Sequence, residues 1–275
     1  MVSVTTLAGC AENPPKNGQM QMSVAVREYV DEAISLMREK SLFKHEADWQ
    51  NVRSEVYRLA EGARSPQDSY QAIAAGLKLL DHHSFFSDRD NRWVPPPDYE
   101  ETTEPTFPLD PVGLLLDQQV AYLLIPQTPW DPEREVEYAA RIQSLMKEVD
   151  GDNTCGWIID LRSNRGGNMW PMLEAVGSLI EPDDDGRLGA WVRPDIESPE
   201  WWGFRDGEGF STDWDVPNYV AEDYIVSKPA APIAILIGGW TGSSGEFLAV
   251  AFIGRAKTAL FGEDSAGYLT CLLYT

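Results

Sequence analysis

Several residue types are scarce in this chain, and each scarcity excludes a class of function. Its three cysteines, Cys10, Cys155 and Cys271, have neither the spacing of a zinc site nor the pairing of a disulfide framework. There are 22 basic residues against 44 acidic ones, a formal net charge of −22. Nucleic acid and anionic membranes would repel such a chain, so neither is expected as a partner. No apolar run reaches the eighteen or so residues of a transmembrane helix.

The rest of the composition is typical of a globular protein. Hydrophobic residues make up 43% of the 275 positions and ten are tryptophan, which is enough to build a core. The length fits one large domain and a small one. The sequence contains no internal repeat and no low-complexity tract, which argues against a solenoid.

Both ends of the sequence carry signals of processing or of truncation. Residues 7–10, LAGC, look like a bacterial lipobox with Cys10 as the lipidated residue, although the stretch before them is too short for a complete signal. The match is either chance or the end of an incomplete signal. We expect the latter, with residues 1–22 as a tether in the cell envelope. Residues 271–275, CLLYT, are what one frame of a sequencing adapter encodes, so we expect the natural chain to continue past Thr270.

Apolar periodicity predicts a small helical domain over residues 23–90. An i, i+3, i+4, i+7 stripe favours amphipathic helices at 23–40 and 47–61. Ser65 and Pro66 are typical of a helix start, with serine as N-cap, and predict a third helix running to about residue 80. Residues 91–110, rich in proline, are predicted to be a linker.

Residues 111–275 alternate between strand and helix signals. Short runs that are apolar on both faces predict buried strands, and longer periodic runs between them predict helices. This alternation favours an α/β domain with a largely parallel sheet. Residues 181–228 are acidic and tryptophan-rich, and are predicted to be an irregular lid or binding wall. The expected strands are 120–125, 156–161, 233–237 and one near 260–262; the expected helices are 133–149, 169–180 and 243–253.

Three short motifs carry the chemistry. LDHHSFF (residues 80–86) places His82 and His83 beside an acid. DLRSNRGG (160–167) follows a buried strand, and its glycines could either point N–H groups at a substrate or form an ordinary turn. TGSSGE (241–246) places serines at a helix start, where free N–H groups can steady an oxyanion.

Ser243 has a second interpretation. Ser243-x-x-Glu246 is a capping box, in which serine and glutamate satisfy N–H groups at a helix start. The G-x-S-x-G pattern of an α/β-hydrolase nucleophile elbow does not fit either serine. From this stretch alone, a plain cap and a nucleophile both remain open.

Taken in order, the motifs resemble the tail-specific, or C-terminal processing, serine peptidase family. IIDLRSNRGGNMW is similar to its DLRxNxGG segment, TGSSGEF to its T-x-S-S/A-x-E nucleophile turn, LFGEDSAG to its G-E-x-T-x-G strand end, and LDHHSFF to its D-x-H-S/T-x-F turn. The resemblance covers roughly residues 70–270. It implies a crotonase-like (ClpP-like) catalytic domain beneath an N-terminal three-helix cap, incomplete at its C-terminus.

The resemblance also assigns roles residue by residue. Ser243 matches the nucleophile of amide hydrolysis and His83 the general base, and the reaction would pass through an acyl-enzyme without a metal or organic cofactor. The Ser244 N–H would face the Gly166 and Gly167 backbone across an oxyanion hole. Independently of the resemblance, the loops of residues 181–228 are predicted to wall the substrate cleft with Trp201, Trp202 and Trp214, and Trp240 is predicted to bind substrate as well. The alternative is that these tryptophans are buried packing residues.

The sequence departs from the lysine branch of this family. Where that branch has a basic lysine, this chain has Tyr268, and no insert of PDZ size separates His83 from the strand at 120–125. The resemblance therefore favours a histidine-base member, with the acid that orients His83 expected beyond Thr270. The substrate would be a peptide or a protein. Two other functions stay open: a non-catalytic module that binds lipid or peptide on the same fold, and an acyl-CoA enzyme, which the acidic surroundings disfavour.

Overall fold

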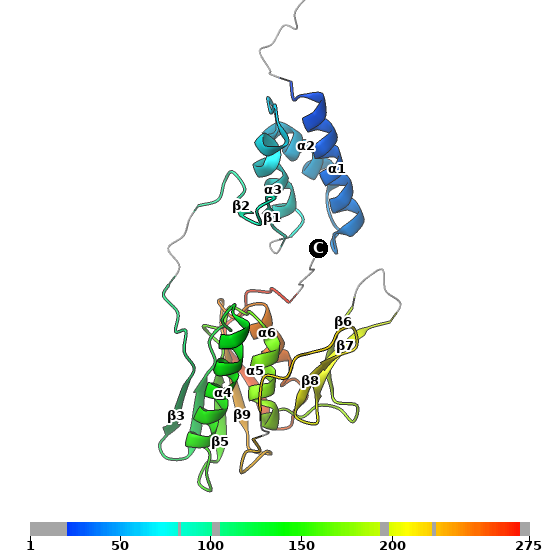
Figure 1. The fold of residues 1–275 in the computed structure, drawn as a ribbon. Helices are drawn as coiled ribbons and strands as arrows, with labels where there is room; N and C mark the ends of the chain where they lie inside the picture. The colour runs from blue at the N-terminus through cyan, green and yellow to red at the C-terminus, as the bar shows by residue number, and fades with distance from the viewer. Residues whose placement is uncertain (1–20, 82–83, 101–104, 193–197, 222–223, 270–275) are drawn as a thin grey trace, which may run out of the picture. The chain divides into compact units, whose positions relative to one another are not determined.

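The structure is a computed structural model, and it describes residues 21–81, 84–100, 105–192, 198–221 and 224–269 (Figure 1). The chain divides into two compact units, Met1–Thr102 and Thr103–Thr275. His82, His83, Cys10 and the C-terminal residues 270–275 lie outside the described residues.

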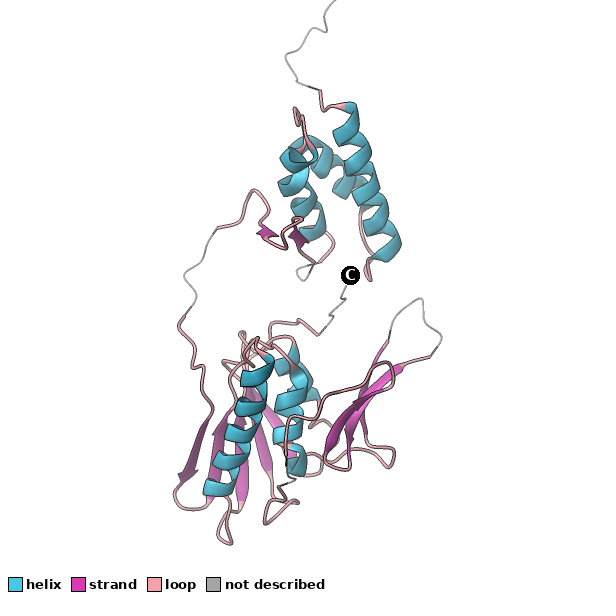
Figure 2. Ribbon diagram, in the orientation of Figure 1, coloured by secondary structure: helices cyan, strands magenta, loops and turns pink. Residues whose placement is uncertain are grey.

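The first unit is mainly helical (Figure 2). Apolar residues of three helices form its core, among them Val30 of the first, Val56 of the second and Ile73 of the third. The helices predicted at 23–40 and 47–61 are confirmed, and the third begins as a 3-10 turn and ends at Lys78. Two very short strands follow. The elements are α1 (Val24–Lys40), α2 (Trp49–Leu59), η1 (Pro66–Ser69), α3 (Tyr70–Lys78), β1 (Phe86–Ser87) and β2 (Trp93–Val94).

The second unit is built on a five-stranded sheet in the order β10-β9-β5-β4-β3. β10, β9, β5 and β4 are parallel, as predicted, and β3 pairs antiparallel with β4 at one edge. β3 was not expected, because its hairpin turn uses Asp117 and Gln118 at positive φ where a glycine signal is usual. The strands are β3 (Val112–Leu116), β4 (Val120–Leu124), β5 (Gly156–Asp160), β9 (Ile233–Ile237) and β10 (Thr258–Gly262).

One face of this sheet carries the core of the unit. Ala121, Trp157 and Ile233 are register partners on neighbouring strands, and all three are buried. Helices fill the connections between strands, and α4 and α5 lie side by side against the sheet (Figure 1). The helix predicted at 169–180 is interrupted after Ala175. The helices are α4 (Pro132–Val149), α5 (Met169–Ala175), η2 (Gly177–Leu179) and α6 (Ser244–Val250).

The prediction that residues 181–228 are irregular is wrong for three strands of that stretch, while its role as a lid or binding wall stays a prediction. A three-stranded antiparallel sheet is formed there by β6 (Arg187–Trp191), β7 (Glu200–Arg205) and β8 (Glu208–Ser211). Asp206 and Gly207, with φ of 53° and 88°, join β7 to β8. Two residues at positive φ are typical of a type I′ hairpin, and Asp-Gly is its usual sequence.

Candidate active site

The polar motifs of the second unit meet at one edge of the sheet. β4, β5 and β9 are adjacent and parallel, so the loops that leave their carboxyl ends are neighbours. In parallel α/β sheets this is where ligands bind. Hydrogen bonds join these loops: Thr128 N–H donates to the Gly166 carbonyl at 3.0 Å, and Gly242 N–H donates to the Asn164 carbonyl at 3.0 Å.

Ser243 lies at the sharp turn between β9 and α6. Its φ of 51° and ψ of −123° match the first central position of a type II′ turn, a conformation that costs a residue with a side chain. Ser243 is half-buried and is the N-cap of α6. A serine on a strained strand-to-helix turn is the local geometry of a nucleophile elbow, even though the G-x-S-x-G pattern is missing.

The capping box predicted from the sequence is present, and it fixes this turn. In the glutamate half of the box, Glu246 Oε2 accepts a hydrogen bond from Ser243 N–H at 2.8 Å. Separately, Glu246 N–H donates to the backbone carbonyl of Ser243 at 2.9 Å. The cap and the strained backbone occur in the same residue. The two interpretations of Ser243 are therefore compatible.

Gly166 packs directly against the serine turn. With φ of 106°, it adopts a conformation that favours glycine, and a Cβ on it would lie 2.8 Å from Ser243 Cβ. Its own N–H donates to Asn164 Oδ1 at 2.9 Å. Gly166 therefore gives the serine turn room, while its N–H already has an acceptor.

Two other N–H groups at this point have no acceptor among the residues that the structure describes. One belongs to Gly167, and the other to Ser244 in the first turn of α6. Ser244 Oγ donates to the Gly167 carbonyl at 2.5 Å, so the two loops that carry these N–H groups are tied together. Free N–H groups at a helix start can stabilise an oxyanion.

Asn164 organises the loop after β5. It is fully buried, and its Nδ2 donates to the carbonyls of Ile125 and Pro126 at 3.1 and 3.2 Å. Its Oδ1 accepts from Gly166, and its backbone carbonyl accepts from Gly242. One amide side chain and its backbone thus fix three loops relative to one another. From the sequence, Asn164 could be recognised only as a member of the DLRSNRGG motif. Its contacts could not be predicted, because its partners Ile125, Pro126 and Gly242 are 39, 38 and 78 positions away in the chain.

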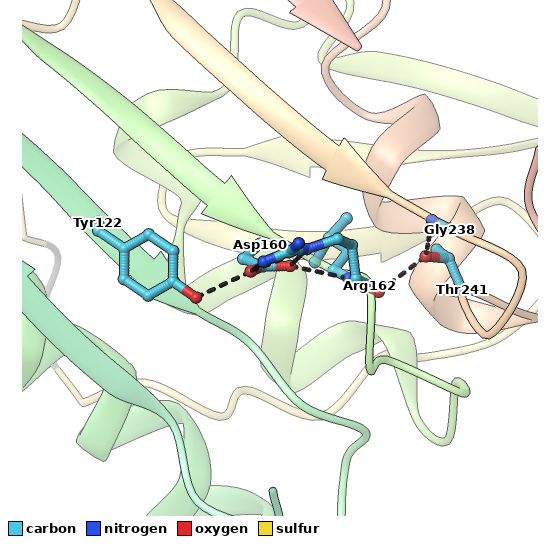
Figure 3. Close-up of polar contacts among 6 residues, drawn as sticks. Tyr122, Asp160, Arg162, Gly238 and Thr241 are labelled. Atoms are coloured by element: carbon cyan, nitrogen blue, oxygen red, sulfur yellow. Dashed lines mark hydrogen bonds and ion pairs between the residues drawn. The ribbon is translucent and has the colours of Figure 1, made fainter. Parts of the chain in front are cut away.

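Asp160, Arg162 and Tyr122 form a polar cluster beside these loops (Figure 3). Arg162 Nη2 lies 2.6 Å from Asp160 Oδ2, and the Tyr122 hydroxyl donates to the same oxygen at 2.8 Å. Burial alone would raise the pKa of Asp160, but the hydrogen bonds from Arg162 and Tyr122 outweigh it and hold the pKa below its usual range. Burial and the bond to Asp160 raise the pKa of Tyr122 to about 12.

Thr241 joins the serine turn to the end of β5. Its Oγ1 donates to the Leu161 carbonyl at 2.8 Å and accepts from Gly238 N–H at 3.0 Å (Figure 3). Thr241 is fully buried, so both bonds are protected from water. In the DLRSNRGG motif, the Asp-Leu-Arg part therefore holds the loops in place. The Asp160 carboxylate is not available to a substrate, because Arg162 and Tyr122 already occupy its oxygens.

The predicted cleft tryptophans separate into different environments. Trp202 is 1% exposed and packs edge-on against Phe247 of α6 at 5.5 Å between ring centres, which leaves it no surface for a substrate. Trp201 is half-buried beneath the Arg187 guanidinium. Trp240 is 43% exposed and lies three residues before Ser243, with the Phe107 ring 5.3 Å away. Trp214 is also exposed and contacts Trp191.

The turn predicted to hold the base is described only at its ends. Asp81 Oδ1 accepts from Ser84 N–H at 2.6 Å, and Asp81 Oδ2 accepts from the Ser84 hydroxyl at 2.8 Å, on either side of His82 and His83. The roles predicted for His83 and Cys10 remain predictions.

Two further searches cover the part of the chain that the structure describes. No three histidine, cysteine or acidic side chains there lie together as metal ligands would. No helix there is long and apolar enough to cross a bilayer.

A strained serine at a helix start, with one free N–H in the helix and one on the neighbouring glycine loop, is an arrangement that serine hydrolases use. Comparison with known proteins gives the family. The sequence profile of peptidase family S41 matches residues 119–271, more than half of the chain. The chain belongs to peptidase family S41, the tail-specific protease family that its motifs resemble, and this membership supports a serine peptidase.

Two further comparisons cover more of the chain than the family profile does. The chain is 27% identical over 247 residues to the nisin-resistance protein of Lactococcus lactis subsp. lactis. The aligned residues cover 88% of this chain and 70% of that protein. The fold of this chain is similar to that of a lipoprotein from Streptococcus agalactiae, with a TM-score of 0.59, 19% identity, and coverage of 96% of this chain and 82% of the other.

Proposed function

We propose that this protein is a serine peptidase that hydrolyses peptide bonds through an acyl-enzyme on Ser243. The observation that carries the proposal is the backbone of Ser243, strained at the start of α6 next to two free N–H groups. Such strain is retained where the surrounding structure forces it, and it presents the serine oxygen at the surface of the turn. Membership of family S41 supports the same reaction.

The oxyanion hole is assigned to the N–H groups of Gly167 and Ser244. Both lack an acceptor within the described residues, and the Ser244 hydroxyl bond to the Gly167 carbonyl keeps them in one place. The Gly166 N–H is already bound by Asn164, so Gly166 has a different role: because it lacks a Cβ, it leaves room for the serine turn. Removing one such donor from an oxyanion hole costs roughly 10²–10³ in kcat.

His83 is the proposed general base. It would take the Ser243 proton and return it to the leaving amine, with no cofactor in either step. The position that holds the base in the lysine branch is Tyr268, whose ring lies beside Gly242; a Cβ on that glycine would be 3.0 Å from Tyr268 Cδ2. A histidine base makes activity rise through about pH 6–7, whereas a lysine base shifts that rise into the alkaline range.

The proposed substrate is a peptide or a protein, and exposed Trp240 is the strongest candidate to contact it, because it projects from the loop that carries Ser243. Trp201 is a weaker candidate, and Trp202 is assigned to packing. We propose a location in the cell envelope, with Cys10 as a lipid anchor, since a similar fold belongs to a lipoprotein and a relative is named a nisin-resistance protein.

A fluorophosphonate probe tests the nucleophile. The wild-type chain should be labelled at Ser243, and the S243A variant should not be labelled. S244A keeps the nucleophile but loses the hydroxyl bond to the Gly167 carbonyl, so it should still be labelled, at a lower rate. H83A should slow labelling and peptide hydrolysis together. A chain that folds, binds peptide or lipid and resists the probe would instead be a binding module on this fold.

A further inference from the structure

The Glu246 carboxylate is buried and fully occupied. Its residue is 3% exposed, and four donors reach its two oxygens. Oε1 accepts from the Ser265 hydroxyl at 2.5 Å and from Gly267 N–H at 2.9 Å. Oε2 accepts from Ser243 N–H at 2.8 Å and from Tyr268 N–H at 2.6 Å. An ionised carboxylate has about four acceptor sites, so none is left over.

These bonds join two segments that are far apart in the chain. Residues 263–268 follow β10 and run beside the serine turn, since Ala266 N–H donates to the Thr241 carbonyl at 2.8 Å. Glu246 links this segment to Ser243 itself, because one oxygen binds the N–H of both Ser243 and Tyr268. The backbone of Ser243 is therefore fixed by Glu246, and Glu246 is in turn fixed by residues 265–268.

We propose that Glu246 is a positioning residue for the Ser243 nucleophile, acting as a four-donor anchor between the serine turn and residues 265–268. The inference rests on the proposed function of Ser243. It goes beyond the capping box, which needs only one acceptor for the Ser243 N–H. The anchor holds a strained turn whose relaxation would move the serine oxygen, and a displacement of about 1 Å can cost roughly 10²-fold in rate.

The isosteric variant E246Q separates the two roles. Capping boxes accept glutamine as well as glutamate, so a residue that only caps α6 tolerates this change. In the anchor, an NH₂ at the Oε2 position would leave the N–H groups of Ser243 and Tyr268 without an acceptor. An NH₂ at the Oε1 position would leave the Gly267 N–H without one, since the Ser265 hydroxyl can turn to accept. We expect E246Q to fold, with fluorophosphonate labelling of Ser243 and kcat reduced roughly 10²-fold at a nearly unchanged KM.

Two further variants calibrate this result. E263Q makes the same chemical change at an exposed residue of the same segment, and should react at the wild-type rate. S265A removes one of the four donors and leaves the backbone ones, so labelling should slow by only about fivefold. S265A also keeps the test valid if E246Q does not fold. Wild-type labelling rates in both E246Q and S265A would overturn the proposal.

Amide hydrogen exchange gives a readout that does not depend on activity. The N–H groups of Ser243, Gly267 and Tyr268 should be protected in the wild type. In E246Q, either Gly267 or the pair Ser243 and Tyr268 should exchange much faster, while the core amides of β5 stay protected. If wild-type Ser243 resists the probe, the nucleophile assignment fails, and the exchange data alone decide whether the anchor exists. Unchanged protection of these three amides in a folded E246Q would overturn it.

Discussion

Replacing Gly166 with alanine tests how closely the glycine loop and the serine turn fit together. The new Cβ would lie 2.8 Å from Ser243 Cβ and 3.1 Å from both the Gly242 carbonyl oxygen and the Ser244 nitrogen. Two of these atoms are backbone, so neither turn can yield by rotating a side chain. Alanine would also have to adopt the φ of 106°.

Both costs can be given a size. A left-handed backbone costs a residue with a side chain about 1–2 kcal/mol, and overpacking of a tight site costs about 1–3 kcal/mol. The free energy of unfolding should therefore fall by about 2–5 kcal/mol, which lowers Tm by roughly 5–15 °C in a unit of this size. Since the contact is with Ser243 itself, probe labelling should fall roughly 10²-fold.

Gly254 supplies the matched control. Its φ is 91°, and a Cβ there would meet nothing within 4 Å, so G254A carries the backbone cost without the contact. Thermal unfolding and the rate of fluorophosphonate labelling should be measured for both variants. If G166A loses no more stability than G254A and is labelled at the wild-type rate, the two loops do not fit together as described.

The cluster around Asp160 gives two further predictions. Because the folded-state pKa of Asp160 is lowered, its contribution to stability is present above about pH 4 and is lost as the pH falls through the folded pKa, so D160N should be less stable than wild type in urea unfolding at pH 7, with the difference shrinking at pH 3. A constant difference would contradict this. The pKa of Tyr122 is raised, to about 12, so its pH dependence runs the other way. The contribution of Tyr122 to folding stability is present below about pH 10 and is lost as the pH rises toward 12. In an alkaline absorbance titration, Y122F should lack one late-ionising phenol, while Tyr224, also at about 12, still titrates late.

Much of the fold follows from local patterns in the sequence. β4, β5 and β9 are short runs with apolar residues on both faces, and such runs are typical of buried parallel strands. The helices of the first unit follow from their 3.6-residue stripes and their capping residues. The β7–β8 hairpin could have been found, since Asp206-Gly207 is a common hairpin signal inside a stretch that composition alone marked as irregular.

The site was less predictable than the fold, because its parts are defined by contacts between distant residues. The sequence located Ser243 and the glycine loop but could not tell which glycine N–H is free, since this depends on the side chain of Asn164. Trp202 and Trp240 both looked suited to line a cleft, yet the first is buried behind Phe247 and the second is exposed. The occupancy of the Glu246 carboxylate depends on residues 19 to 22 positions away.

The links between the loops also set the order in which the protein can mature. Ser244 bonds to a residue 77 positions earlier, and Thr241 to one 80 positions earlier, so neither contact can form before the sheet has brought β5 and β9 together. The entropy of loop closure grows with the separation, so contacts of this range form after local ones. The contacts of Glu246 need residues 265–268 as well, so this last support of the serine turn forms only when that segment is in place. If Ser243 has the proposed role, the nucleophile reaches its working geometry only after the sheet around it has formed.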